Sequence, residues 1–233
     1  MKGKGMSLKN TLVTVANLAR TWPSNKTDEM KSLADSAYNQ GWYLNEVFIF
    51  GLHFSEHDNF DDNVIAVIDE GWSDYWEMLS EYQPARSELF NEIRKCHEAG
   101  LYGAAINLCF SQADGIFYDK FEKSLYGSGF NIAKSQFNEE INEFISRDSL
   151  ETLRMHYKDK SLFKRMFNEV YLEVLSKTRG DLVKNTKDTA ESSLSIPNRH
   201  GVIHGVHTEY ATKLGSYKVI AFLLFIFYAL KGL

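Results

Sequence analysis

The sequence predicts an all-α protein. Apolar residues recur at helical spacing along nearly the whole chain of 233 residues. Long alternations with a period of two, which a half-buried strand would show, are missing. Hydrophobic residues make up 44% of the composition and aromatic residues 14%, so the chain can bury a sizeable core without disulfides or structural metals.

Two helices are expected in the first 50 residues. An apolar stripe over 8–19 has to stop near Trp22, because the residue before Pro23 avoids helical dihedral angles. A second helix over 27–50 is expected to break at Gly41. An aromatic stretch follows this glycine, and a strand is the alternative there.

The middle of the chain predicts three longer helices. The apolar positions of 64–79 fit one long helix. Pro84 suits the first turn of the next helix, which runs to His97. The segment 102–125 is apolar on most sides and is followed by Gly127, so it predicts a central helix.

The last third contains the segment that is apolar all round. Helices are expected over 131–146, 148–157 and 160–178. The polar stretch 184–195 predicts a loop, with a short helix inside it as an alternative, and a short helix is expected to start at Pro197. The final helix, about 211–231, predicts an element in the middle of the bundle or at a subunit interface.

The bulk properties indicate a soluble cytoplasmic protein. Its lone cysteines, Cys96 and Cys109, predict reduced core thiols, with a disulfide between them as the weaker alternative. The start of the chain does not resemble a secretory signal. The longest apolar run, 219–230, has 12 residues where a membrane span needs about 20, so no membrane crossing is expected.

The net charge of −5 is unevenly distributed. Residues 1–146 hold 12 Lys and Arg against 22 Asp and Glu, which gives −10, whereas residues 147–233 hold 14 against 9, which gives +5. An anionic ligand meeting the second half would suit this asymmetry, although an excess of five is no nucleic-acid signature by itself.

The candidate site is the segment 198–205, with the sequence NRHGVIHG, in which Arg199 stands five residues before His204. With eight arginines and seven histidines, this spacing arises by chance about 0.7 times in such a chain, so the pattern gains weight only from its place. It lies at an expected helix start, directly before the most apolar helix.

An arginine and a histidine in this arrangement could cleave a phosphodiester without a metal. Arg199 stays charged and can place two donors on phosphate oxygens. His204, offset by about 140° on a helix, could take a proton from a ribose 2′-hydroxyl or deliver one to the leaving 5′-oxygen. Because one histidine does not easily make both proton transfers, the two histidines of a dimer could act as base and acid. The alternative is a capping or salt-bridging arginine beside a satisfied core histidine.

A metal site is the other alternative for this segment. His200 and His204 lie one helical turn apart, and His207 follows. However, Gly201 stands where a zinc hydrolase of the His-Glu-x-x-His type needs its glutamate, and Glu209 is the one carboxylate at close spacing. No metal ligand set is therefore predicted.

Two further polar groups stand out. Gln112 and Asp114 interrupt an otherwise apolar helix. A carboxylate in such a place needs a partner, so Asp114 either faces Arg199 or His204 and orients them, or bonds the end of a neighbouring helix or a basic side chain elsewhere. The densest basic cluster favours a solvated face, with weak RNA binding as the alternative; it consists of Lys158, Lys160, Lys164 and Arg165.

The segment 198–205 resembles the Arg-[Asn/His/Asp]-x3-5-His signature of the HEPN superfamily. The segments 97–102 and 108–116, with Tyr118 and Asp119 after them, look like a bacterial branch of that superfamily. The resemblance covers about residues 84–233. It therefore implies a HEPN-like helical domain over 84–233 and an additional N-terminal helical region over 1–83.

The resemblance implies an all-α bundle that forms a homodimer, in which two Arg/His motifs build one composite site. Many members are metal-independent endoribonucleases of toxin–antitoxin, abortive-infection and antiviral defence systems. The chain is accordingly expected to cleave RNA by transesterification without a cofactor, as a cytoplasmic toxin or phage-defence effector with an antitoxin or defence-system partner.

Roles for individual residues follow from the same resemblance. Arg199 would bind phosphate, His204 would be the general acid or base, and His200 the polar position after the arginine. Independently of the resemblance, Asn198, Gln112 and Asp114 are expected to support these residues. Toxins modified by a partner nucleotidyltransferase carry a tyrosine two residues past the histidine, where Val206 stands here. Some members are non-catalytic modules that bind nucleotide, RNA or protein, which is the alternative function.

Overall fold

The computed structural model describes residues 25–52, 57–127, 180–186 and 190–231, together with 135, 136, 139, 170, 171, 173–175 and 177. No strand occurs in these ranges, so the prediction of an all-α protein is confirmed. The helices expected over 8–19 and 148–157 lie outside the described residues, as do most residues of those expected over 131–146 and 160–178.

The expected break at Gly41 separates two helices, α2 (Asn25–Asn39) and α3 (Glu46–Leu52). Gly41 has a φ of +83°, a left-handed conformation that favours glycine. A Cβ atom there would also overlap the backbone carbonyl of Ser195. The residues between the two helices form a turn and an irregular segment rather than a strand. α3 begins where the side chain of Asn45 accepts hydrogen bonds from the backbone of Val47 and Phe48.

The prediction of a single helix over 64–79 is wrong, because the segment forms two helices, α4 (Phe60–Glu70) and α5 (Trp72–Tyr82). They meet at Gly71, whose backbone N–H closes the last turn of α4 on Val67. A Cβ atom at Gly71 would lie 2.6 Å from the ring of Tyr75, so the glycine lets this buried aromatic residue pack against the bend. The apolar pattern runs on through the bend and hides it.

The next two helices follow the expected ranges closely. A short 3₁₀ helix, η1 (Pro84–Arg86), leads into α6 (Ser87–Glu98), and α7 covers Tyr102–Phe121. α7 ends four residues before the expected boundary, because Glu122 adopts the left-handed conformation with a φ of 53°.

The C-terminal part places two 3₁₀ turns and a short helix before the last helix. These elements are η3 (Asp181–Val183), η4 (Glu191–Ser193), α10 (Arg199–Ile203) and α11 (Lys213–Leu230). The stretch expected as a loop thus contains η4, and α11 begins where the side chain of Thr212 accepts from the backbone N–H of Gly215.

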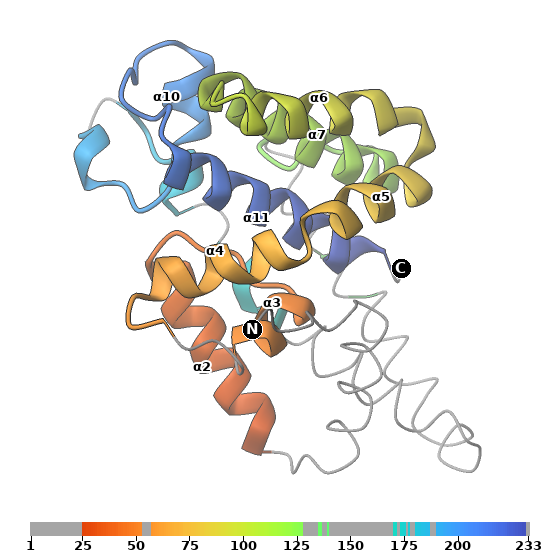
Figure 1. Ribbon diagram of the computed structural model, residues 1–233, viewed down its shortest axis with the longest axis vertical. Helices are drawn as coiled ribbons and strands as arrows, with labels where there is room; N and C mark the ends of the chain where they lie inside the picture. Colours follow the sequence, from red (N-terminus) through yellow and green to blue (C-terminus); the bar gives the residue numbers. More distant parts are fainter. Residues whose placement is uncertain are drawn as a thin grey trace, which may run out of the picture.

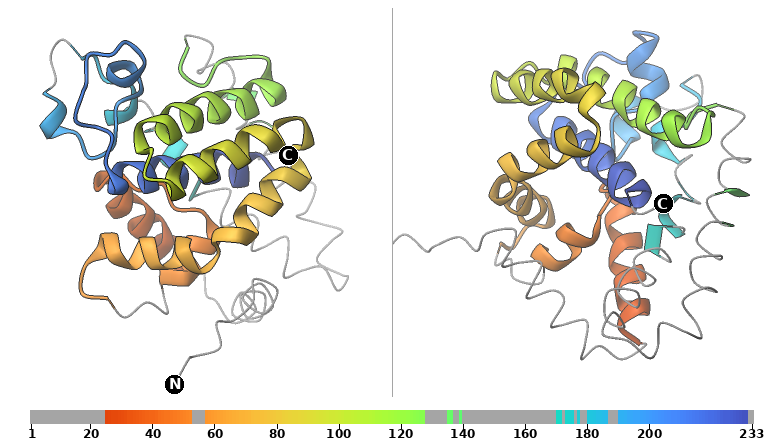
Figure 2. Two further views of the ribbon diagram at one scale, coloured as in Figure 1. Left: turned by 45° about the horizontal axis from the view of Figure 1, so that its top comes forward. Right: turned by 90° about the vertical axis from the view of Figure 1, so that its right-hand side faces the viewer.

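α11 is the central element of the fold. It lies between α6 and α7 on one side and the helices α2, α3 and α4 on the other (Figures 1 and 2). From Gly215 to Leu230 every residue is buried, and Phe222 contacts Tyr43 edge to face with ring centroids 4.9 Å apart. The hydrophobic core is one cluster that includes residues on both sides of position 83.

By length and composition α11 could cross a membrane, and it is the one described helix that could. However, 89% of the relevant window is buried inside the structure. A core helix of a soluble protein meets the same criteria of length and composition, so α11 gives little support to a membrane span. Its burial matches the predicted helix in the middle of the bundle.

A buried histidine couples the packing of α6 and α11 to pH. Nδ1 of His97 lies 2.8 Å from Oγ of Ser216, and its ring lies 4.5 Å from that of Tyr217 and 5.0 Å from that of Trp72. Burial, the largest cause, lowers the pKa of His97, and the charge of Lys213 lowers it further, whereas Asp69 and Glu98 oppose this effect. The folded protein therefore favours the neutral imidazole.

The free energy of unfolding is expected to fall as the pH drops below about 6.5, because the unfolded chain then binds a proton that folded His97 resists. One such proton gives a slope of at most about 1.4 kcal/mol per pH unit. Urea unfolding of the wild type and of His97→Gln between pH 5 and 7.5 measures this slope. The exposed His57 supplies the control, since His57→Gln should keep the wild-type slope. Equal slopes in wild type and His97→Gln would contradict the assignment.

Candidate functional site

The Arg/His segment forms α10, and Asn198 fixes its start. The Asn198 side chain is buried, and its Oδ1 accepts from the backbone N–H of Gly201 at 2.8 Å, as an N-cap does. Its Nδ2 donates to the backbone carbonyls of Asp181 at 2.5 Å and Lys184 at 3.2 Å. Asn198 thereby holds α10 against η3, which is a supporting role through position rather than through contact with a reactant.

Gly201 and His207 fix the other side of α10. The His207 ring occupies the place where a Cβ atom of Gly201 would stand, and the backbone N–H of His207 donates to the carbonyl of Gly201 at 3.0 Å. His207 is buried, and within the described residues its Nδ1 has no hydrogen-bond partner. Gly201, which stands where a zinc hydrolase would need its glutamate, therefore makes room for the imidazole ring of His207.

Arg199 points from α10 toward α7 and the turn after it. Its guanidinium carbon lies 4.8 Å from the ring centroid of Tyr126, a cation–π contact. The side chain is half-buried, and no carboxylate in the described ranges forms an ion pair with it. Because a cation–π contact uses no hydrogen-bond acceptor, the N–H groups of the guanidinium are left for a ligand.

Arg199 lines a cavity of about 570 Å³ between α7 and α10. The lining residues are Arg86, Phe110, Ser111, Asp114, Gly115, Tyr118, Tyr126, Arg199 and Ile203. This volume is within the range of small-ligand sites in proteins. The wall contains two guanidinium groups and three hydroxyl groups and thus supplies mainly hydrogen-bond donors.

His204 lies beside His200 rather than beside Arg199. The two rings meet edge to face with centroids 4.5 Å apart, and both residues are exposed. His204 stands at the C-terminal end of α10, where its backbone N–H donates to the carbonyl of His200. The short helix thus presents an imidazole pair on one side, while Arg199 and Ile203 line the cavity on another.

Asp114 forms its hydrogen bonds to the turn that ends its own helix. It accepts from Oγ of Ser124 at 2.9 Å and from the backbone N–H of Leu125 at 2.7 Å. Although Asp114 lines the same cavity as Arg199, these bonds hold the turn that carries Tyr126. These hydrogen bonds match neither alternative for Asp114, because they go to the turn after its own helix and not to Arg199, His204, a neighbouring helix end or a basic side chain.

Gln112 is paired with an arginine that the sequence did not single out. Its side-chain oxygen accepts from Nη1 of Arg86 at 3.0 Å, and Nε and Nη2 of Arg86 donate to Asp119 at 3.0 and 2.8 Å. The Arg86 guanidinium lies where a Cβ atom of Gly115 would stand. Gln112, Gly115 and Asp119 share one face of α7, and that spacing was the signal that could have located Arg86.

The chemistry of Tyr126 follows from its position beneath Arg199. Burial, the largest cause, and then the charge of Asp114 raise the pKa of Tyr126, whereas Arg199 acts in the opposite direction. The hydroxyl therefore stays protonated and donates to the carbonyl of Phe110 at 3.2 Å. Tyr126 therefore contacts the guanidinium as a neutral ring and does not act as a general acid or base.

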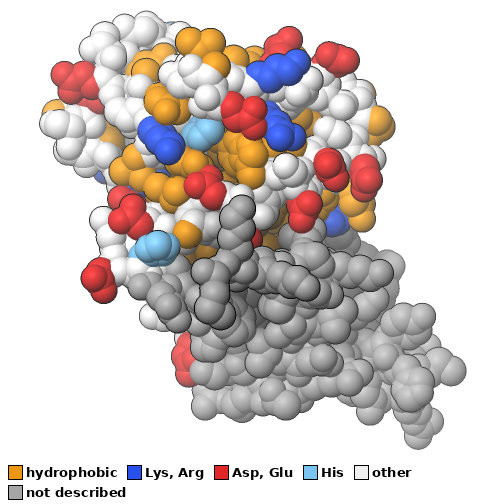
Figure 3. All heavy atoms as spheres, in the orientation of Figure 1, with side chains coloured by type: hydrophobic (Ala, Val, Ile, Leu, Met, Phe, Trp, Pro, Cys, Tyr) orange, Lys and Arg blue, Asp and Glu red, His pale blue; other side chains and the backbone are white. Residues whose placement is uncertain are grey.

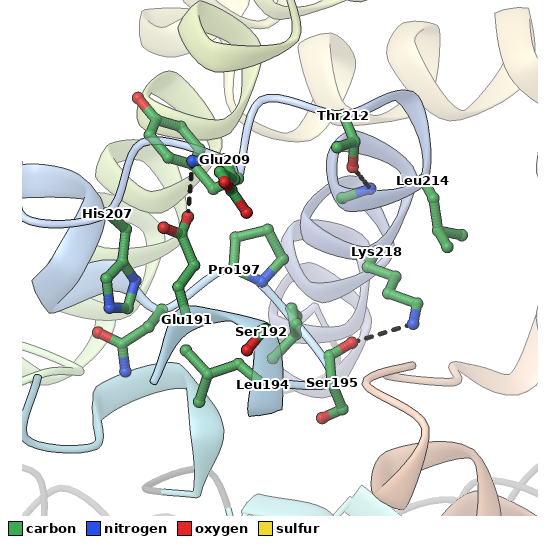
Figure 4. A pocket seen from close by; sticks show the side chains of 14 residues that line it. Glu191, Ser192, Leu194, Ser195, Pro197, His207, Glu209, Thr212, Leu214 and Lys218 are labelled. Carbon is green, nitrogen blue, oxygen red and sulfur yellow. Dashed lines mark hydrogen bonds between the residues drawn. The ribbon is translucent and has the colours of Figure 1, made fainter. Parts of the chain in front are cut away.

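A smaller cavity of about 240 Å³ lies on the other side of the segment, between η4 and the start of α11 (Figure 4). Both oxygens of Glu191 accept backbone N–H groups there, from Thr208 at 3.0 Å and Glu209 at 2.9 Å. Lys218 donates to the carbonyls of Gln40 and Ser195 at 2.7 and 3.0 Å, and burial lowers its pKa. These polar groups bind the loops that carry α10 to the rest of the protein.

The remaining sequence predictions are placed as follows. The basic cluster of Lys158, Lys160, Lys164 and Arg165 lies outside the described residues. In the part of the chain that the structure describes, no three His, Cys, Asp or Glu side chains are grouped so that they could share a metal ion. On the face shown in Figure 3, the described Lys and Arg side chains are interspersed with Asp and Glu rather than gathered in a basic track.

Comparison of the chain with protein-family models, with curated proteins and with solved structures finds no match.

Proposed function

We propose that this protein is a metal-independent endoribonuclease that works as a homodimer. The observation that carries the proposal is the surface of α10. There an arginine without a carboxylate partner among the described residues begins the five-residue helix α10, and an exposed imidazole pair is formed by His200 on that helix and His204 directly after its last residue. A fixed cation and titratable imidazoles are the groups that a phosphodiester transesterification requires.

In this reaction Arg199 binds the non-bridging oxygens of the scissile phosphate and stabilises the charge that grows on them. His204 takes the proton from the ribose 2′-hydroxyl, whose oxygen attacks phosphorus. The bond from phosphorus to the 5′-oxygen breaks, and an imidazolium returns a proton to that oxygen. The products are a 2′,3′-cyclic phosphate and a 5′-hydroxyl, and no water or metal enters the step.

The imidazole pair could supply both the general base and the general acid of this reaction. His200 lies in ring contact with His204, so one chain presents two imidazoles side by side. Arg199 and His204 leave α10 in different directions, with Arg199 in the cavity and His204 on the open surface. A second copy placed against α10 would bring its own motif to the same phosphate, which is why we assign the site to a dimer.

The surface around His204 supports a second copy at this place. Ile203 and Val206 lie on either side of His204 in the sequence and are 45% and 58% exposed. A dimer that covers Val206 would exclude water from the imidazoles. In the cell we assign the protein to the cytoplasm as a toxin or phage-defence effector, held in check by an antitoxin or defence-system partner.

Analysis of the RNA ends tests this function. Purified protein is incubated with RNA in excess EDTA, and the termini are examined by mass spectrometry and by their response to polynucleotide kinase. We expect cleavage that EDTA does not stop, with 2′,3′-cyclic phosphate and 5′-hydroxyl ends. RNA that is bound but left intact would instead favour the non-catalytic binding module, and cleavage that EDTA abolishes would favour a metal hydrolase.

A further inference from the structure

The cavity beside Arg199 combines a cation with an exposed aromatic ring. Tyr118, on α7, is 55% exposed and lines the same wall as Arg199 and Ile203. Ring contacts account for many of the other aromatic residues, such as Phe110 with Tyr126 and Phe117 with Phe121, but no ring contact of Tyr118 occurs within the described residues. An exposed aromatic side chain next to an available guanidinium is a site where a base can stack while its phosphate is bound.

The polar groups of the cavity suit a base edge better than they suit phosphate alone. The hydroxyl of Ser111 is exposed on α7, one turn before the Asp114 carboxylate. Arg86 uses three of its five N–H groups on Asp119 and Gln112, which leaves two. A donor, an acceptor and a hydroxyl therefore line one wall, and a cavity of about 570 Å³ has room for a base with its sugar.

We propose that this cavity holds one nucleotide unit of the substrate, with its phosphate on Arg199 and its base against the ring of Tyr118 and the side chain of Ile203. The inference rests on the proposed ribonuclease function and names Tyr118 as a residue that determines substrate specificity. A base can enter the cavity only when it is unpaired, so the enzyme acts on single-stranded segments, and the cavity selects the nucleotide beside the scissile bond.

Binding of small ligands tests the cavity apart from cleavage, because a mononucleotide has no phosphodiester to cut. Calorimetry compares adenosine 5′-monophosphate, ribose 5-phosphate and inorganic phosphate on the wild-type dimer. We expect the nucleotide to bind about tenfold more tightly than ribose 5-phosphate, a gain typical of one stacked base. Tyr118→Ala should remove that gain, Tyr118→Phe should keep it, and Arg199→Ala should weaken all three ligands.

Tyr82 provides the matched control, since it is exposed to the same degree on α5 and Tyr82→Ala should leave all three affinities unchanged. Equal affinity for nucleotide and ribose 5-phosphate, or an unchanged preference in Tyr118→Ala, would overturn the proposal. The two proposals fail separately: RNA cleavage without a base preference removes the stacking site alone. A Tyr118-dependent base preference without any cleavage removes the ribonuclease alone and leaves a nucleotide-binding module.

Discussion

Replacing His204 by alanine should slow RNA cleavage by about 10²- to 10⁴-fold, the usual contribution of a positioned general acid or base. Arg199→Ala should slow it by about 10²- to 10³-fold, because a donor aimed at the developing phosphate charge is lost. Both side chains reach the surface of α10, and the contact of Arg199 with Tyr126 contributes only about 1 kcal/mol to stability. The variants should therefore fold like the wild type.

Rates are measured with a fluorescent RNA in EDTA, and unfolding in urea shows whether each variant is folded. Arg199→Lys separates charge from geometry, since a lysine keeps the charge but not the two-pronged donor, so its rate should fall between wild type and Arg199→Ala. Arg94→Ala and His57→Ala are the matched controls, because both residues lie outside α10 and its cavity. Wild-type rates in folded Arg199→Ala and His204→Ala would remove both residues from the reaction.

Phe222→Ala should lower the free energy of unfolding by about 3–5 kcal/mol, the range for truncating a fully buried phenylalanine. Phe222 lies at the middle of α11 with no solvent exposure, and its ring packs on Tyr43. Its removal leaves a cavity between α11 and the segment that joins α2 to α3.

Urea unfolding followed by circular dichroism measures this loss, provided that the transition stays two-state. Leu214→Ala is the control on the same helix, because Leu214 is only partly buried and should cost less than half as much. A loss below about 1 kcal/mol for Phe222→Ala would contradict the central place of α11 in the core.

The sequence located the elements whose cause is local. The helices near 102–125 and 211–231 are long and strongly apolar, and both are present with shifts of a few residues. The break at Gly41 was also predicted, since a glycine before a change of pattern is a local signal. The break at Gly71 was not, because its cause is the ring of Tyr75 packing against the bend while the apolar spacing continues unchanged.

The candidate site shows the same limit of local information. The Arg/His spacing identified α10, and the sequence suggested that Arg199 and His204 point in different directions. Contacts between distant segments could not be predicted from the sequence. Asp114 accepts a hydrogen bond from the turn after α7, and Arg86, from another element, packs against Gly115. A lone carboxylate in an apolar helix reveals that a partner exists and not which one. The pairing of two copies stays a prediction.

The shared site can be tested most directly with a mixed dimer that contains one Arg199→Ala subunit and one His204→Ala subunit. The two chains carry different affinity tags, and sequential purification isolates the mixed dimer. If the motifs of two chains act on one phosphate, the mixed dimer retains one arginine and one histidine at the site and should cleave RNA at least tenfold faster than either mutant homodimer. Cleavage no faster than that of the homodimers, or a protein that stays monomeric while cleaving RNA, would contradict the account.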